Sequence, residues 1–485
     1  MTEATARSVT ARASLGTTAL LWNEARALLP IWMAGVGAVT IAGLTDGPGV
    51  RALRRLIFVD IHAVSLVVCL ASMIGLGAQI IGHEYSNRTL GVTLMLPLGR
   101  RRLFWLKQAT LATLLLPLVV CVWWLDVFDK FPALPWLAAG TALTFAPVWT
   151  ILCQSALAGA VFSAAVPGTV LTIISIVVRT FFGLVDDERV ALEAWTWLMA
   201  ALLPIGGVLA WHLFLRLEAI EGRATDISLR WLTGKPRAAV PGHPLWVLLK
   251  KELRLQQMAF ALTALFVTGA TAIALWDTWM YGDRLLTAPL RAASAVYWSG
   301  LPVLIGALAT AEERQLGTIA WQLQLPTPSR LQWAVKIGTV FSLAILLAVI
   351  APALLTEVLW PVERRNLPIA FILAIVTTAA SVYISSLCTT GVRAAVTSLA
   401  AIPLSLWLVA AFALAIRRPP VSPALWTGRE GSWLVVIVLL VLTLISLAFV
   451  NHRPDPPPLR RVWQQSLAIA VVLTAGVIGL EIARL

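Results

Sequence analysis

One polar block occurs twice in this chain of 485 residues, and its repetition constrains the fold more than any other feature of the sequence. The second copy aligns with the first without a gap, at an offset of 229 residues. The shared positions are Glu84, Thr89, Leu94, Leu96, Pro97, Arg101 and Lys107 in the first copy, and Glu313, Thr318, Leu323, Leu325, Pro326, Arg330 and Lys336 in the second. A fixed internal period is the sign of a duplicated structural unit. The sequence therefore predicts two similar halves.

The similarity continues upstream of the block. Leu20–Arg26 and Leu248–Arg254 both contain Leu-Leu-x-x-Glu-x-Arg, with a shift of one residue in the offset. Gly77 likewise matches Gly306. We expect residues 1–235 to form the first half and residues 236–463 the second, with the polar linker 218–243 at the seam.

The composition places both halves in a membrane. Hydrophobic residues make up 59% of the chain and charged residues 13%, about half the charged fraction of soluble proteins. A membrane-spanning helix needs about 20 mostly apolar residues, because its backbone must be satisfied internally. Apolar runs of this kind lie near 28–45, 56–82, 108–127, 137–160, 169–184 and 195–216 in the first half, and near 259–280, 294–311, 337–360, 368–390, 394–416 and 431–450 in the second. We predict an all-α polytopic membrane protein with two six-helix halves in parallel repeat, plus an additional C-terminal transmembrane helix within 464–485.

The basic residues predict the orientation of the chain. Lysine and arginine accumulate on the cytoplasmic side of membrane proteins, and most of the 37 in this chain fall there if the N-terminus is cytoplasmic. We therefore expect a multi-pass protein of the cell membrane with a cytoplasmic N-terminus. The net charge of +13 is explained by a basic face against anionic lipid, and it does not indicate nucleic-acid binding, which needs a soluble basic surface.

Each half begins with an amphipathic stretch, Leu20–Leu29 and Leu245–Met258, which is typical of a helix lying in the membrane interface. The alternative is that these stretches are the cytoplasmic ends of the first span in each half. The repeated block follows the second predicted span, and it should form a surface helix over Tyr85–Leu96 and Arg314–Leu325 that ends at a proline, which has no amide hydrogen to donate.

The basic residues at the end of each block predict contacts with lipid. Arg101 and Lys107, like Arg330 and Lys336, begin the next span, where a cation is expected at the level of the lipid headgroups.

At this block the chain resembles the permease subunits of type-2 ABC exporters. Their cytoplasmic loop between the second and third spans typically reads Glu, Gly-Thr, Leu-Leu, Pro, Ser-Arg and Lys. The second copy fits through Glu313, Gly317-Thr318, Pro326, Ser329-Arg330 and Lys336. The first copy departs from the pattern, with Thr89-Leu90-Gly91 in place of Gly-Thr and Gly99-Arg100-Arg101 in place of Ser-Arg.

The resemblance implies that the block is a coupling helix that docks on an ATP-binding subunit. The residues implied in coupling are Glu84, Thr89, Pro97, Arg101, Lys107, Glu313, Gly317, Thr318, Pro326, Arg330 and Lys336. The chain has no G-x-x-x-x-G-K-[ST] phosphate loop, so ATP and Mg²⁺ should bind to a partner chain and this chain should not be an enzyme. Two copies of the ATPase are expected, one under each block, and the apolar composition suggests an amphipathic or hydrophobic substrate.

Two other classes of protein are compatible with twelve spans. A secondary transporter of the major facilitator type also has two parallel six-span halves, but its loop after the second span is shorter and carries an aspartate before Gly-Arg. A membrane-embedded enzyme would need ionisable residues within the spans, where the candidates are Asp60, His62, Arg179 and Glu357. Asp60 and His62 point in different directions on a helix and are explained by solvation near the outer surface, and His83, beside Glu84, is explained by a contact with lipid headgroups, so no metal is predicted.

Overall fold

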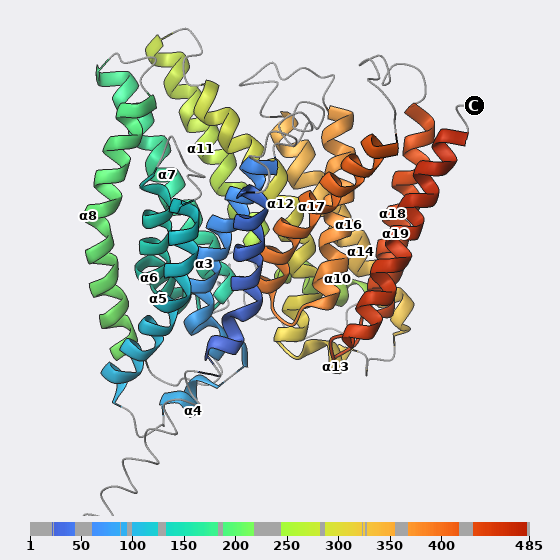
Figure 1. The fold of residues 1–485 in the computed structure, drawn as a ribbon, viewed down its shortest axis with the longest axis horizontal. Helices are drawn as coiled ribbons and strands as arrows, with labels where there is room; N and C mark the ends of the chain where they lie inside the picture. Colours follow the sequence, from blue (N-terminus) through green and yellow to red (C-terminus); the bar gives the residue numbers. More distant parts are fainter. Residues whose placement is uncertain are drawn as a thin grey trace, which may run out of the picture. The chain divides into compact units, whose positions relative to one another are not determined.

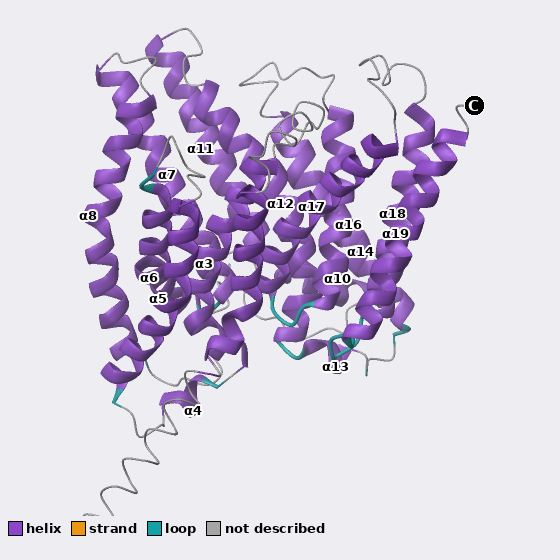
Figure 2. Ribbon diagram, viewed as in Figure 1, coloured by secondary structure: helices purple, strands orange, loops and turns teal. Residues whose placement is uncertain are grey.

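A computed structural model of the chain describes residues 22, 24–43, 61–87, 89–94, 99–124, 132–182, 188–217, 244–281, 287–322, 324, 327–354, 367–416 and 430–482. All regular secondary structure in these ranges is helical (Figure 2). The described residues divide into two compact units, with residues up to 217 in unit 1 and residues from 244 onward in unit 2. The predicted linker 218–243 lies outside the described residues, as do Asp60 and Glu357.

Unit 1 is a bundle of long helices with one short helix at its end (Figure 1). It contains, in order, the N-terminal helix Glu24–Gly43, α3 (Ile61–Asn87), the short α4 (Leu90–Leu94), α5 (Arg100–Trp124), α6 (Leu134–Cys153), α7 (Ala156–Phe182) and α8 (Glu188–Leu215). The short α4 connects the end of α3 to the start of α5, so it lies at the end of the bundle where these two helices meet.

Unit 2 also has a short helix between two long helices. It contains α10 (Pro244–Leu255), α11 (Gln257–Tyr281), α12 (Thr287–Gln315), the short α13 (Thr318–Gln322), α14 (Ser329–Ile345), α16 (Leu367–Leu387), α17 (Gly391–Ile416), α18 (Glu430–Val450) and α19 (Leu459–Ile482). A π-helical turn, η1 (Leu346–Ile350), continues α14. The short α13 connects α12 to α14, as α4 connects α3 to α5.

The helices confirm an all-α polytopic membrane protein. Within the described residues, eight helices are long and apolar enough to cross a membrane, or nine if the bent pair Leu245–Leu255 and Gln257–Ile273 is one span. The other predicted spans coincide with helices α12, α17 and α18, and α19 occupies the predicted C-terminal segment. That these four cross the membrane, and that the two units form a parallel repeat of six-helix halves, stay predictions.

The two units differ in their first helices. In unit 2, α10 is a separate amphipathic helix that meets the next helix at 56°, and its position in the membrane interface stays a prediction. In unit 1, residues from Glu24 onward belong to one continuous helix that ends at Gly43. For the described part of Leu20–Leu29, the prediction of a separate interfacial helix was wrong, and the alternative of a span end fits.

Close contact between helices holds the core of each unit. A Cβ atom on Gly77 of α3 would lie 2.2 Å from the carbonyl oxygen of Ala142 in α6. A Cβ atom on Gly306 of α12 would lie 2.8 Å from the carbonyl oxygen of Thr378 in α16. Small residues allow such close backbone approach in membrane helix pairs. The matched glycines therefore place α3 and α12 at the centre of their units.

Candidate functional site

A cluster of ionisable side chains, cluster 1, lies inside unit 1 and consists of Glu24, His83, Glu84 and Lys107. The Lys107 ammonium lies 2.5 Å from Glu24 Oε1 and 2.9 Å from Glu84 Oε1. It also donates a hydrogen bond of 3.2 Å to the carbonyl oxygen of Ile80. The exposed fractions are 4% for Glu24, 1% for Glu84 and 2% for Lys107. One ammonium therefore joins the N-terminal helix, α3 and α5 in a region closed to solvent.

Unit 2 contains a second such cluster, cluster 2, which consists of Lys251, Glu252, Glu313 and Lys336. Lys336 Nζ lies 2.5 Å from Glu313 Oε2 and 3.2 Å from Glu252 Oε1. Lys251 also pairs with Glu313, and its ammonium lies 3.7 Å from Glu252 Oε1. Both carboxylates and Lys336 are buried, whereas the Lys251 side chain is 28% exposed. Two ammonium groups thus balance two carboxylates.

The two clusters share a core of three equivalent residues. Glu24, Glu84 and Lys107 correspond in sequence to Glu252, Glu313 and Lys336, which form the same Glu-Lys-Glu arrangement. Lys336 also donates to the carbonyl oxygen of Ala309 at 2.8 Å, the equivalent of the bond from Lys107 to Ile80. The repeated sequence positions therefore have the same geometry in the two units.

The short helices are connected to the clusters through the repeated threonine. The backbone N–H of Thr89 donates to the carbonyl oxygen of Glu84 at 3.0 Å, and the hydroxyl of Thr318 donates to that of Glu313 at 3.2 Å. In each short helix the next residue anchors the helix to the protein, with Leu90 9% exposed and Ile319 1% exposed.

Two predictions about the block need correction. The helices expected over Tyr85–Leu96 and Arg314–Leu325 are interrupted, because α3 ends at Asn87 and α12 at Gln315 before the short helices begin. Gly317 adopts a φ of +69°, a left-handed conformation that glycine tolerates and that terminates α12.

Lys107 and Lys336 are not exposed to lipid headgroups as expected, since both are buried in ion pairs. Their repeated carboxylate partners hold them inside. Arg101 and Arg330, one and a half to two turns earlier in the same helices, are exposed as predicted. Pro97 and Pro326 lie outside the described residues.

The burial of these charges defines what the clusters can do. Removing an ion from water costs several kcal/mol, which only good geometry and additional hydrogen bonds repay. Such clusters fix the register of the helices that they join, and a displacement of one helix must move or break the others' contacts. In both clusters the charged groups contact one another and helix carbonyl oxygens, so within the described residues their observed role is to join helices.

Arg314, next to cluster 2, connects the end of α12 to two other connectors of unit 2. Its guanidinium donates to the carbonyl oxygens of Ser386, in the last turn of α16, and of Cys388 just after it, and to those of Asn451 and Arg453 after α18. The ends of these three helices therefore meet beside α13. The equivalent position in unit 1 is Tyr85, so this connection belongs to unit 2.

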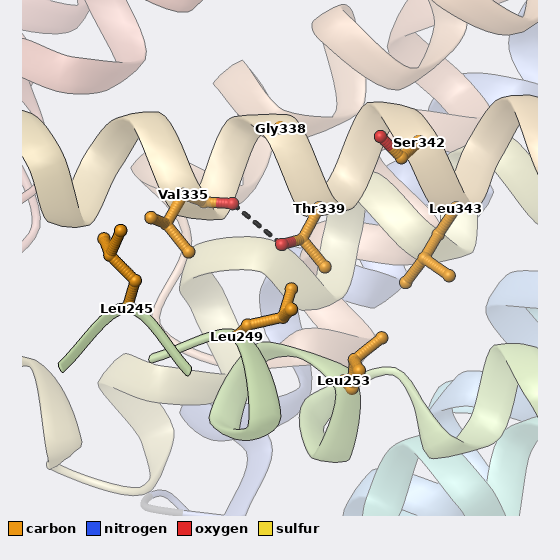
Figure 3. Close-up of a pocket in the computed structure, with 8 residues that line it drawn as sticks. All are labelled: Leu245, Leu249, Leu253, Val335, Gly338, Thr339, Ser342 and Leu343. Carbon is orange, nitrogen blue, oxygen red and sulfur yellow. Dashed lines mark hydrogen bonds between the residues drawn. The ribbon is translucent and has the colours of Figure 1, made fainter. Parts of the chain in front are cut away.

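An apolar groove of about 470 Å³ lies between α10 and α14 (Figure 3). Three leucines at helical spacing on α10 face one side of α14, and the groove is lined by Leu245, Leu249, Leu253, Val335, Gly338, Thr339, Ser342 and Leu343. The Thr339 hydroxyl is used within its own helix, where it donates to the Val335 carbonyl at 2.8 Å. The groove therefore suits an apolar chain and offers no ionisable group for chemistry.

The sequence reasoning missed three members of the clusters. Glu24 and Glu252 were part of the upstream match, but they precede the block by 60 residues or more and were not connected with it. Lys251 has no equivalent cation in the first half, and so the repeat could not reveal it. Both glutamates could have been recognised as candidates from their charge, since an ionisable residue repeated beside a membrane span usually has a charged or polar partner.

The helices and the buried clusters define this chain as a multi-pass, all-α membrane protein with a duplicated ionic core. Comparison with protein-family models, with curated proteins and with solved structures gives no match. The functional argument therefore depends on the resemblance of the repeated block and on the geometry of this chain.

Proposed function

We propose that this chain is the transmembrane permease subunit of an ATP-driven ABC exporter, which forms the substrate path and couples it to a separate ATP-binding subunit. One repeated arrangement supports the proposal. In each unit a short helix lies between two long helices and is hydrogen-bonded to a residue of a buried Glu-Lys-Glu core. The proposal includes a cell-membrane location, a cytoplasmic N-terminus and two copies of the ATPase.

The contacts of the block suggest two distinct tasks for its residues. Arg101 and Arg330 are exposed at the start of α5 and α14, where they are available to a docking partner. The buried glutamates and lysines cannot make that contact, and they act instead on the helices that they join. In this division, the short helix receives the motion of the ATPase, and the core passes it to three helices at once.

Coupling of this kind needs a continuous physical connection. In unit 2 the connection runs from Thr318 through the carbonyl of Glu313 to its carboxylate, and from there to Lys336 in α14 and Lys251 in α10. In unit 1 the connection starts from the backbone N–H of Thr89, which donates to the carbonyl of Glu84. The amphipathic or hydrophobic character of the substrate is part of the proposal and derives from composition alone.

The first test is the composition of the native complex. The full chain is affinity-purified from its own membranes in mild detergent, and the proteins that co-purify are identified and quantified. We expect an ABC ATPase at two copies per chain, and vanadate-sensitive ATP hydrolysis in the eluate. A purified chain that transports a substrate in liposomes without any ATPase, driven by an ion gradient, would show that the proposal is wrong.

The second test separates docking from transmission. Arg330→Ala should reduce recovery of the ATPase, whereas Glu313→Gln should leave recovery intact and abolish substrate stimulation of ATP hydrolysis. Arg460→Ala is the matched control, because Arg460 is an exposed arginine in the first turn of another helix of unit 2, outside the block. If all three variants behave alike in both measurements, the block has no role in coupling.

A further inference from the structure

We propose that cluster 1 is a binding site for a divalent transition-metal ion of the zinc class, held by Glu24, His83 and Glu84. One ligand atom from each of these residues lies within 4.8 Å of the others. The N-terminal helix supplies the first ligand and α3 supplies the other two, so the ion would fasten these two helices together. This inference does not depend on the proposed transport function.

The carboxylates of cluster 1 have unused oxygen atoms. Lys107 occupies Oε1 of both Glu24 and Glu84. The Oε2 atoms of both residues are buried and make no hydrogen bond within the described part of the chain. A buried carboxylate oxygen without a partner is costly and requires an explanation. A second cation on the Oε2 side would satisfy both atoms.

The orientation of His83 favours a metal ion as that cation. His83 Nδ1 lies 3.0 Å from the carbonyl oxygen of Gln79, and because a carbonyl can only accept, Nδ1 must carry the proton. Nε2 lies 3.4 Å from Glu24 Oε2, and with the Nδ1 proton on the Gln79 carbonyl it is the ring nitrogen available to an ion on the Oε2 side. A histidine that donates one ring N–H to a backbone carbonyl is the usual arrangement of a metal ligand.

The distance between these two atoms also fits coordination. With metal–ligand bonds of about 2.0–2.1 Å, two ligands of a tetrahedral ion lie about 3.3 Å apart. The observed separation of 3.4 Å between Nε2 and Oε2 matches this edge, although the two atoms form no hydrogen bond with each other.

The comparison with cluster 2 gives an independent reason for a second cation. There, two carboxylates are balanced by two ammonium groups, Lys336 and Lys251. In the sequence the position of Lys251 is taken by Asn23, and within the described residues Lys107 is the one ammonium group beside the two carboxylates of cluster 1.

The ligand set narrows the ion to a chemical class. Imidazole with two carboxylates suits zinc, manganese and iron, whereas magnesium and calcium prefer oxygen ligands alone. We therefore expect the site to bind Zn²⁺ and Co²⁺ and to exclude Mg²⁺.

The experiment uses the tag-free full chain in detergent, stripped with chelator and then titrated with Zn²⁺, Co²⁺ or Mg²⁺. We expect about one Zn²⁺ per chain to survive gel filtration, and Co²⁺ to give the intense visible absorption of a tetrahedral site. His83→Ala should weaken binding at least tenfold. His212→Ala, which removes an exposed histidine from α8 of the same unit, should leave binding unchanged.

His83→Cys keeps the test decisive if His83→Ala does not fold. A thiolate at a ligand position adds a near-ultraviolet charge-transfer band to the Co²⁺ spectrum, and a cysteine that is not a ligand adds none. Equal binding in the His83→Ala and His212→Ala variants, or the absence of retained Zn²⁺ in the wild type, would overturn the proposal. The proposal would also be overturned if the free energy of unfolding in metal-free buffer rose as the pH fell, provided that this rise required His83 and that Zn²⁺ did not change it. The second cation would then be a proton.

Discussion

Replacement of Lys336 by methionine tests whether the charges of cluster 2 are held by one another. The variant keeps the length of the side chain and removes an ammonium that contacts Glu313 at 2.5 Å, Glu252 at 3.2 Å and the Ala309 carbonyl at 2.8 Å. Two buried carboxylates then share Lys251 as their remaining cation. Breaking a buried ion pair from one side costs about 3–5 kcal/mol, and the lower end applies here because Lys251 remains.

The expected loss is large enough to measure by thermal unfolding in detergent. About 3 kcal/mol corresponds to a fall of roughly 10 °C in the unfolding midpoint for a unit of this size. Lys250→Met is the control, because Lys250 is an exposed lysine on α10, one residue from the cluster. Its midpoint should stay close to that of the wild type, since exposed substitutions change stability by about 0.5 kcal/mol or less.

A triple variant separates stability from coupling. Replacing Glu252, Glu313 and Lys336 together by methionine removes the desolvated charges, and such replacements are often neutral or stabilising. Lys251 would keep its bond to Gln322 and its partial exposure. We expect the midpoint to recover while substrate-stimulated ATP hydrolysis in the complex stays lost. A Lys336→Met midpoint equal to that of Lys250→Met would refute the reasoning about burial, and full ATPase stimulation in the triple variant would refute the role in transmission.

Further predictions concern single residues. Gly306→Ala places a Cβ 2.6 Å from a Ser381 atom and should lower the unfolding midpoint, whereas Gly300→Ala on the same helix meets nothing within 4 Å and should not. Gly317→Ala should cost about 1 kcal/mol in unfolding free energy, because alanine resists the left-handed conformation that ends α12. Arg314→Ala should increase amide hydrogen exchange in the connector between α18 and α19, whose carbonyls it now binds, and unchanged exchange would contradict the role of this side chain. His452 is buried near three cations, which lowers its pKa to about 4, so stability should fall as the pH drops from about 6.5 toward 4 and His452→Phe should remove that slope.

The helices were predictable from the sequence because hydropathy and length determine them. The run predicted at 431–450 is α18 (Glu430–Val450), and the run at 394–416 is α17 (Gly391–Ile416). The boundary between the fourth and fifth predicted spans of the first half was misplaced, since apolar residues continue across it. There, α6 ends at Cys153 because Gln154 adopts a left-handed conformation with φ of 51°, which a hydropathy pattern does not contain.

The candidate site was predictable only in part. The repeat identified Glu84, Lys107 and their equivalents, and the structure brings them together. The direction in which the Lys107 and Lys336 side chains point was not predictable, because a lysine at the end of a membrane helix usually reaches the headgroups. It turns inward here because two carboxylates from helices distant in sequence offer it a buried site, and only the tertiary packing of the N-terminal helix and α3 provides that site.

The differences between the clusters predict that the two units respond unequally to equivalent changes. Lys107→Met leaves Glu24 and Glu84 buried without any ammonium, whereas Lys336→Met leaves Lys251 beside both carboxylates. The loss of unfolding free energy should therefore be near about 5 kcal/mol in unit 1 and near about 3 kcal/mol in unit 2. Unfolding of each unit can be followed separately by hydrogen exchange with mass spectrometry, using peptides from α3 and α12. Equal losses would mean that Lys251 contributes nothing to the balance of charge in cluster 2. A larger loss in unit 2 would contradict this account of the charge balance in the two clusters.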